Sequence, residues 1–167
     1  GASLHELIET EGVTYSAGVP TNWQMLLAHL KETGGKLTTL QRVTVGGAAL
    51  PESIIRTLRD DYGVDVVQGW GMTETSPLGT VSVPSPKVAK LSVDEQIAYK
   101  LKQGRLLCNL DLKLIDDEGR RLPHDGKTFG RLMIKGPTIA SGYFGGQHGD
   151  ALDDEGFFDT GDVSTID

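Results

Sequence analysis

One stretch of this 167-residue sequence combines residue types that can bind a phosphorylated ligand, Gly69-Trp70-Gly71-Met72-Thr73-Glu74-Thr75. It directly follows the apolar run 64–68, so we expect it at the end of a strand. The glycines let the backbone turn sharply and approach a ligand closely, and Trp70 offers a flat face for stacking. Thr73 can donate to a phosphate oxygen, and Glu74 can hold a hard cation. The alternative interpretation is an ordinary strand-to-loop turn with a capping Thr.

Two further stretches carry groups that suit a nucleoside. Gly46-Gly47-Ala48-Ala49 matches neither the phosphate loop GxxxxGK(S/T) nor GxGxxG, so it predicts either a tight strand-to-helix connection or nucleoside contact through backbone and methyl groups. Asp162 ends the stretch Phe158-Asp159-Thr160-Gly161-Asp162, and its carboxylate can accept hydrogen bonds from both hydroxyls of a ribose. A turn-stabilising role for Asp162 is the alternative.

The elements that position these stretches alternate between helix and strand in residues 1–83. Capping boxes at Ser3–Glu6 and Thr21–Gln24 predict two helices, and Pro51 predicts the first residue of a third. Strands are expected at 13–17, 42–45 and 64–68, paired in parallel through right-handed crossovers. Ligands gather at the carboxyl ends of such strands. We therefore expect the turns 18–21, 46–49 and 69–75 to share one rim and form a pocket.

The sequence changes character after residue 83. Residues 84–104 read as a connecting segment with a short helix capped by Ser92, whose lysines form a solvated face or, alternatively, contact a partner or a phosphate. The period-two alternation in 105–167 predicts an antiparallel, barrel-like subdomain, truncated at its C-terminus. An acidic run lacks the spacing of a calcium loop and is interpreted as a solvated turn. Its members are Asp150, Asp153, Asp154 and Glu155.

The predicted fold class is therefore α/β, with a partial nucleotide-binding subdomain at 1–83, the connection at 84–104 and the antiparallel part at 105–167. A net charge of -7 argues against a nucleic-acid or anionic-membrane partner. No apolar run approaches the roughly 20 residues of a membrane helix. The single Cys108, expected to be inert and partly buried, excludes an internal disulfide, so a reducing cytoplasm is the simplest compartment. The first residue is Gly and the last residues read as a strand, which indicates an excised segment.

Four stretches, in order, carry a family resemblance. The stretch 69–75 resembles the signature Tyr/Trp-Gly-x-Thr-Glu of the acyl-adenylate-forming enzymes, which include acyl-CoA synthetases, firefly luciferase and peptide-synthetase adenylation domains. The stretches 46–51, 130–143 and 158–162 match in the same order as in that family. The sequence is most similar to medium- and long-chain fatty-acyl-CoA synthetases, as a fragment of their large N-terminal domain.

The resemblance implies an activity and a set of roles. A fatty carboxylate would attack the α-phosphorus of ATP, release pyrophosphate, and then pass from the acyl-adenylate to coenzyme A, with Mg²⁺ as a cofactor. Trp70 would pack on the adenine or border the acyl channel, and Glu74 would hold the Mg²⁺ ion. Thr73 and Glu74 are the implied catalytic residues, and the implied nucleotide-binding residues are Gly47, Ala48, Ala49, Gly69, Trp70, Gly71, Met72, Thr73 at the α-phosphate and Asp162 at the ribose.

Departures from the family pattern leave alternatives open. Arg131 stands where the family has Glu, Leu106 where it has Pro, and Asn109 where Gly is common. The family's upstream phosphate loop and its C-terminal domain with the catalytic lysine are missing, so we expect the segment to fold but not to adenylate alone. An aryl or amino acid substrate is one alternative, and a non-catalytic binding module is another. Retention of Thr73 and Glu74 together with Asp162 favours the enzyme.

Overall fold

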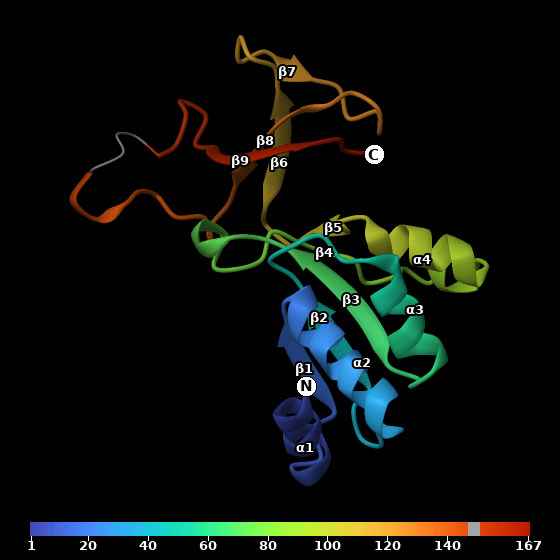
Figure 1. Cartoon of the computed structure of the whole chain (residues 1–167). Helices are drawn as coiled ribbons and strands as arrows, with labels where there is room; N and C mark the ends of the chain where they lie inside the picture. The colour runs from blue at the N-terminus through green and yellow to red at the C-terminus, as the bar shows by residue number, and fades with distance from the viewer. Residues whose placement is uncertain (147–150) are drawn as a thin grey trace. The chain divides into compact units, whose positions relative to one another are not determined.

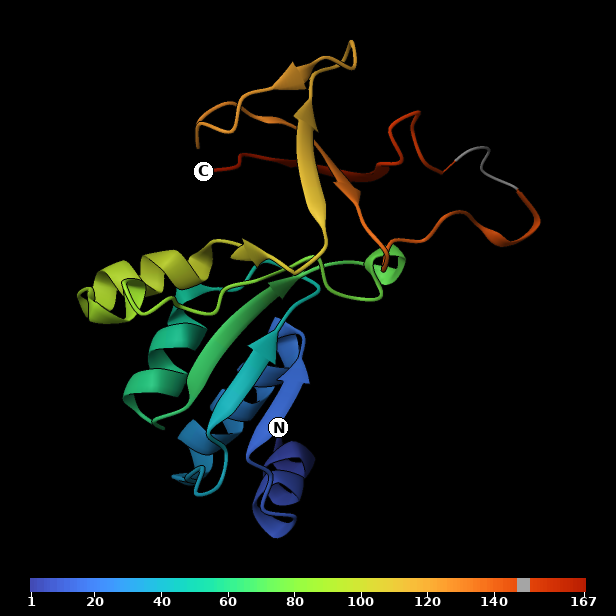
Figure 2. The same ribbon diagram turned by 180° about the vertical axis from the view of Figure 1, so that it is seen from behind.

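The computed structural model describes residues 1–146 and 151–167, which divide into two compact units. The first unit comprises Gly1–Trp70 and Thr80–Arg105, and the second comprises Gly71–Gly79 and Leu106–Asp167. Figure 1 labels their elements, and Figure 2 shows the same ribbon from behind. The three-part division at residues 83 and 104 stays a prediction.

The first unit is built on three parallel strands. Its strands are β1 (Tyr15–Gly18), β2 (Arg42–Val45), β3 (Asp65–Trp70) and β4 (Thr80–Val81), and its helices are α1 (Ala2–Thr10), α2 (Pro20–Thr33), α3 (Glu52–Asp60) and α4 (Val93–Leu101). Gly18 pairs with Val45, and Val45 with Gln68, in parallel register. The expected parallel pairing is confirmed. The sheet order continues through β4, antiparallel to β3, to β5 (Arg105–Leu106).

Helices α2 and α3 lie on one face of the parallel strands, as the two opposite views show (Figures 1 and 2). The apolar spacing of α2 buries Trp23, Leu26 and Leu30 in a core that also takes in buried residues of the strands and the other helices. Gly34 ends α2 in a left-handed conformation, with φ at 68°, as its sequence position predicts.

The two capping boxes predicted at the first helices are wrong. Helix α2 begins at Pro20, because a proline at the first helical position has its φ preset for the helix and needs no N–H partner. Thr21 therefore lies inside the first turn, and Val19 is the N-cap. Helix α1 begins at Ala2 with Gly1 as its N-cap. No side chain caps either helix.

The cap predicted for α4 is confirmed, but one of its lysines is not solvated. The Ser92 N–H donates to Glu95 Oε2 at 2.9 Å, and Ser92 Oγ caps the helix. Lys100 is buried and forms an ion pair with Asp65 of β3. Burial raises the pKa of Asp65, but hydrogen bonds from Lys100 and Arg42 outweigh burial and lower it overall. This ion pair makes the buried ammonium tolerable and ties α4 to the sheet.

The second unit is an antiparallel sheet of order β7-β6-β8-β9. Its strands are β6 (Asp111–Ile115), β7 (Arg121–Leu122), β8 (Gly130–Lys135) and β9 (Phe158–Ser164). The antiparallel prediction and the α/β fold class are confirmed, while closure into a barrel stays a prediction. Asn109 has φ at +65°, the left-handed region that Gly and Asn adopt most readily, which explains why it can replace a family glycine. Cys108 is exposed, so the expectation of a partly buried thiol is wrong.

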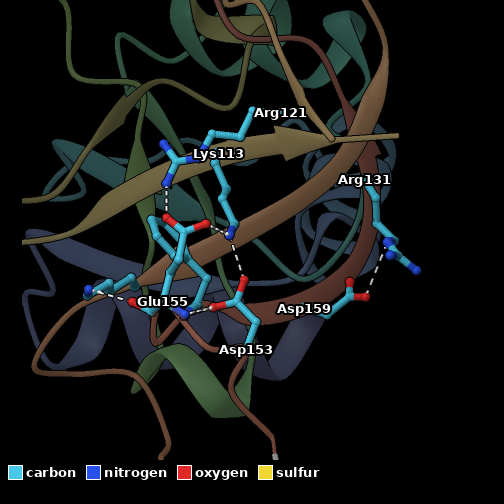
Figure 3. Close-up of polar contacts among 8 residues, drawn as sticks. Lys113, Arg121, Arg131, Asp153, Glu155 and Asp159 are labelled. Atoms are coloured by element: carbon cyan, nitrogen blue, oxygen red, sulfur yellow. Dashed lines mark hydrogen bonds and ion pairs between the residues drawn. The ribbon is translucent and has the colours of Figure 1, made fainter. Parts of the chain in front are cut away.

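Lys113 breaks the alternation predicted for β6, because its side chain is buried beside Leu114 and Ile115. Its ammonium donates to Asp153 at 2.5 Å and to Glu155 at 2.9 Å (Figure 3). The acidic residues at 153–155 are exposed and form a turn, as predicted, but two of them, Asp153 and Glu155, also neutralise a buried cation. Asp150 lies outside the described residues. None of the helices in 1–146 and 151–167 has the length and apolar character of a membrane span.

Candidate functional site

The carboxyl ends of the three parallel strands meet at one rim of the first unit. The Gly46 N–H donates to the Gly18 carbonyl at 3.3 Å. A Cβ added at Gly46 would lie 2.9 Å from the Gly69 carbonyl oxygen, so only a glycine allows this approach of β2 to β3. The sequence predicts that the turns after the three strands share one rim. Within the first unit this is confirmed for the ends of β1, β2 and β3.

The rim carries the predicted adenine-contacting residues on its open side. Gly47 has φ at +79°, a conformation that favours glycine, and Gly47, Ala48 and Ala49 are all exposed. Leu50 is buried and anchors the loop to the core. Trp70 is half-buried at the last position of β3. Exposed backbone and methyl groups beside an indole suit contact with a flat, weakly polar ring.

The loop 71–79 of the second unit has a backbone conformation fixed from within. Thr75 is fully buried, and its hydroxyl accepts from the Met72 N–H at 2.9 Å and donates to the Pro77 carbonyl at 2.6 Å. A Cβ on Gly71 would lie 1.9 Å from that same Pro77 oxygen. The loop can therefore close only with glycine at position 71, and closure leaves Thr73 exposed and Glu74 half-buried.

Glu74 is held from two sides by a segment that lies 66 to 69 positions further along the chain. The Ala140 N–H donates to the Glu74 carbonyl at 2.8 Å, and the Tyr143 hydroxyl donates to Glu74 Oε1 at 2.8 Å. Tyr143 was not predicted as a site residue, although it ends the matched stretch 130–143. The hydrogen bond with Glu74 raises the pKa of Tyr143, so this phenol remains a neutral donor.

Asp162 lies on an irregular part of β9. Arg131 pairs with Val163 and Met133 with Asp159, so the three residues 160–162 stand opposite Leu132 alone. Thr160 is buried and donates to the Leu132 carbonyl at 2.8 Å, and Gly161 has φ at +74°. Such a bulge redirects the side chains around it. Asp162 is exposed, and its N–H donates to Thr160 Oγ1 at 3.1 Å.

The donor set around Glu74 fits a cation that also binds phosphate oxygens. Among residues 1–146 and 151–167, no group of three or more His, Cys, Asp or Glu side chains could hold a metal ion by itself. Mg²⁺ is typically bound through one or two carboxylates together with substrate phosphates and water. A single carboxylate beside the exposed Thr73 hydroxyl matches that pattern, and it does not match a structural metal centre.

Comparison with known proteins identifies the family. The family model described as AMP-binding enzyme matches residues 1–144. The chain belongs to the AMP-binding enzyme family. This AMP-binding chain is 49% identical over its full length to the 3-methylmercaptopropionyl-CoA ligase of Ruegeria lacuscaerulensis, of which it covers 31%. It is 48% identical, again over its full length, to the medium-chain-fatty-acid–CoA ligase of Ectopseudomonas oleovorans, of which it covers 30%.

A solved structure gives the same fold. The long-chain-fatty-acid-CoA ligase of Archaeoglobus fulgidus matches with a TM-score of 0.80 at 26% identity, over 99% of this chain and 34% of that one. The AMP-binding chain spans about a third of the length of the relatives it matches. The structure thus brings together the ends of β1, β2 and β3 in one unit, and joins Glu74 to Tyr143 in the other.

Proposed function

We propose that this chain is part of an acyl-CoA ligase that activates a carboxylic acid with ATP and transfers the acyl group to coenzyme A. The observation that carries the proposal is identity of 49% and 48%, over the whole chain, to two enzymes that are both named acyl-CoA ligases. The residues that would handle the nucleotide are present, and the conformations of their loops depend on glycines at positions 46 and 71.

A contact with the nucleotide is proposed for predicted residues of each unit. In the first unit, Gly47, Ala48 and Ala49 would line the adenine and Trp70 would pack against it or border the acyl channel. In the second unit, Asp162 would accept hydrogen bonds from the ribose hydroxyls. The residues proposed for these adenine and ribose contacts are all exposed or half-buried in their own unit. The backbone of Gly69, Gly71 and Met72 would lie close to the nucleotide.

The chemical step needs positioning and compensation of charge. Attack of a carboxylate oxygen on the α-phosphorus forms a P–O bond, breaks the bond to the β-phosphate oxygen and releases pyrophosphate. Thr73 would donate a hydrogen bond to an α-phosphate oxygen, and Glu74 would hold Mg²⁺. When bound there, Mg²⁺ would offset the negative charge on the phosphate oxygens. Catalysis of such a step comes mainly from holding the reactants in position and from hydrogen-bond donors that are fixed around the phosphate.

Two classes of acyl substrate are favoured by the comparisons, a medium-chain fatty acid and the short thioether acid 3-methylmercaptopropionate. A panel of carboxylates on the intact protein separates them by relative kcat/KM. The panel comprises octanoate, palmitate, 3-methylmercaptopropionate, benzoate and phenylalanine. We expect one of the aliphatic acids to give the highest value. Highest turnover of benzoate or phenylalanine would contradict the fatty-acyl proposal, and no turnover of any acid would favour a non-catalytic module.

Residues 1–167 by themselves should not catalyse the reaction, because they match only about a third of the length of the related acyl-CoA ligases. Pyrophosphate exchange with ATP and the best acid from the panel, run on residues 1–167 alone and on the intact protein, tests this expectation. Exchange by residues 1–167 at a rate near that of the intact protein would contradict this expectation.

A further inference from the structure

The Glu74 carboxylate meets a phenol from a distant part of the chain. Tyr143 follows β8 by eight positions and donates to Glu74 Oε1 at 2.8 Å, across 69 positions of sequence. Both residues belong to the same compact unit. None of the ion pairs among the described residues involves Glu74. The phenol is therefore a neutral hydrogen-bond partner for this carboxylate.

The backbone of the loop is held by other contacts. The buried Thr75 hydroxyl bonds to Met72 and Pro77, and the Ala140 N–H binds the Glu74 carbonyl at 2.8 Å. These bonds place the Cα of residue 74 whether or not residue 143 carries a hydroxyl. The Tyr143 hydroxyl does not hold the backbone; it contacts the Glu74 carboxylate group and affects its orientation.

We infer that Tyr143 is a positioning residue, whose hydroxyl fixes the orientation of the Glu74 carboxylate so that the carboxylate can bind a divalent cation held on a nucleotide phosphate. The inference rests on the proposed function, in which Glu74 is the protein's ligand to that cation. A carboxylate with one oxygen engaged by a donor loses rotational freedom about its terminal bond. Its other oxygen is then presented in a fixed direction.

The neutrality of the partner matters for this role. A lysine at position 143 would orient the carboxylate equally well but would also compete with the cation for it, as Lys113 neutralises Asp153 and Glu155 elsewhere in the same unit. A phenol orients without cancelling charge. Hydrogen-bonding partners of metal ligands typically contribute 10- to 100-fold in metal affinity or activity. Loss of the hydroxyl should therefore weaken cation binding without preventing it.

Tyr143→Phe in the intact protein tests the inference, with Tyr15→Phe as the matched control. Tyr15 also donates through its hydroxyl, to Thr44 Oγ1 at 2.9 Å, but it lies at the amino end of β1, opposite the rim. Two quantities are measured by electron paramagnetic resonance and by calorimetry. The first is the Kd of Mn²⁺ in the presence of a saturating non-hydrolysable ATP analogue, and the second is the Kd of AMP without metal.

We expect Tyr143→Phe to raise the Kd of Mn²⁺ about 10- to 100-fold, with the Kd of AMP changed less than twofold, and Tyr15→Phe to change neither. An unchanged Kd of Mn²⁺ in Tyr143→Phe would overturn the inference. An equal weakening of AMP binding would also overturn it, because that result assigns Tyr143 a general structural role.

Glu74→Gln, measured in the same way, separates failure of the inference from failure of the proposed function. Loss of Mn²⁺ binding in Glu74→Gln, together with wild-type binding in Tyr143→Phe, would refute the positioning role alone. Wild-type Mn²⁺ binding in Glu74→Gln would refute the proposed metal role of Glu74, and the inference with it.

Discussion

The ammonium of Lys113 donates to Asp153 Oδ2 at 2.5 Å, from a side chain that is only 6% exposed. It also binds Glu155 and lies 4.4 Å from the centroid of the buried Phe157 ring, while Arg121 pairs with Glu155 from the other side (Figure 3). These contacts anchor the chain just before β9, the strand that carries Asp162. The anchor therefore supports the strand on which the proposed ribose contact lies.

The first prediction concerns this buried cation. The double change Asp153→Asn and Glu155→Gln should destabilise the intact protein by about 1–3 kcal/mol, because it leaves a buried ammonium without a counter-charge. Addition of Lys113→Met should restore most of the loss, since an apolar side chain of similar length needs no partner. Urea unfolding of the double and triple variants measures both steps. A triple variant no more stable than the double would show that Lys113 is not the group being neutralised.

The same cluster predicts how stability depends on pH. Burial raises the pKa of Asp153, but hydrogen bonds from Lys113 and two backbone N–H groups outweigh it, so the pKa is lowered overall. Hydrogen bonds from Lys113 and Arg121 lower the pKa of Glu155. Both carboxylates therefore contribute stability above their unfolded-state pKa values of about 3.9 and 4.3, and the contribution is lost as pH falls through the lower folded-state values.

Unfolding free energies measured between pH 3 and 7 should fall on the acid side of about pH 4 in the wild type. The slope should be shallower in the Asp153→Asn, Glu155→Gln variant, because its amides do not titrate. Parallel pH profiles for the two proteins would mean that these carboxylates have the same pKa values folded and unfolded.

A third prediction concerns loop 71–79. Gly71→Ala should destabilise the loop by about 1–3 kcal/mol, because the new methyl group meets the Pro77 carbonyl oxygen, a backbone atom that cannot swing aside. Gly142→Ala is the control, since a Cβ there meets nothing within 4 Å. Thermal unfolding of the two variants tests the difference. Equal transition temperatures would indicate that the loop opens without cost.

A fourth prediction concerns Asp162. Asp162→Ala in the intact protein should raise the KM for ATP about 10- to 100-fold, the range expected for lost hydrogen bonds to a charged acceptor. It should also abolish the preference for ATP over 2′-deoxy- or 3′-deoxy-ATP. Asp154→Asn, an exposed carboxylate of the same unit, should leave both quantities unchanged. If Asp162→Ala still discriminated against the deoxynucleotides, the proposed contact between Asp162 and the ribose would be wrong.

Much of the fold could be predicted from the sequence because its signals are local. The sequence pattern of a few residues predicts the strand at 42–45. The glycine that follows the apolar spacing of α2 likewise predicts its left-handed end at Gly34. The Ser92 cap of α4 is equally local. The rim of the first unit followed from a rule about parallel strands, which needs no distant side chain.

The contacts that sequence reasoning missed join residues that are far apart in the chain. Lys113 reads as an outward residue of an alternating strand, and only partners 40 and 42 positions away make its burial possible. Tyr143 reaches Glu74 across 69 positions. Arg131, a departure from the family pattern, pairs with Asp159 of the neighbouring strand at 3.3 Å. The alternation of apolar and polar residues along a strand does not predict which residues of two strands pair.

Glu74 is proposed to bind the Mg²⁺ ion that ATP-dependent activation of a carboxylate requires. Pyrophosphate exchange by Glu74→Gln in the intact protein, measured as a function of Mg²⁺ concentration, tests this role most directly. Loss of a charged metal ligand should reduce exchange at least 10- to 100-fold at fixed Mg²⁺ and shift the required Mg²⁺ concentration upward, while AMP still binds without metal. Wild-type exchange with an unchanged Mg²⁺ dependence would contradict the account.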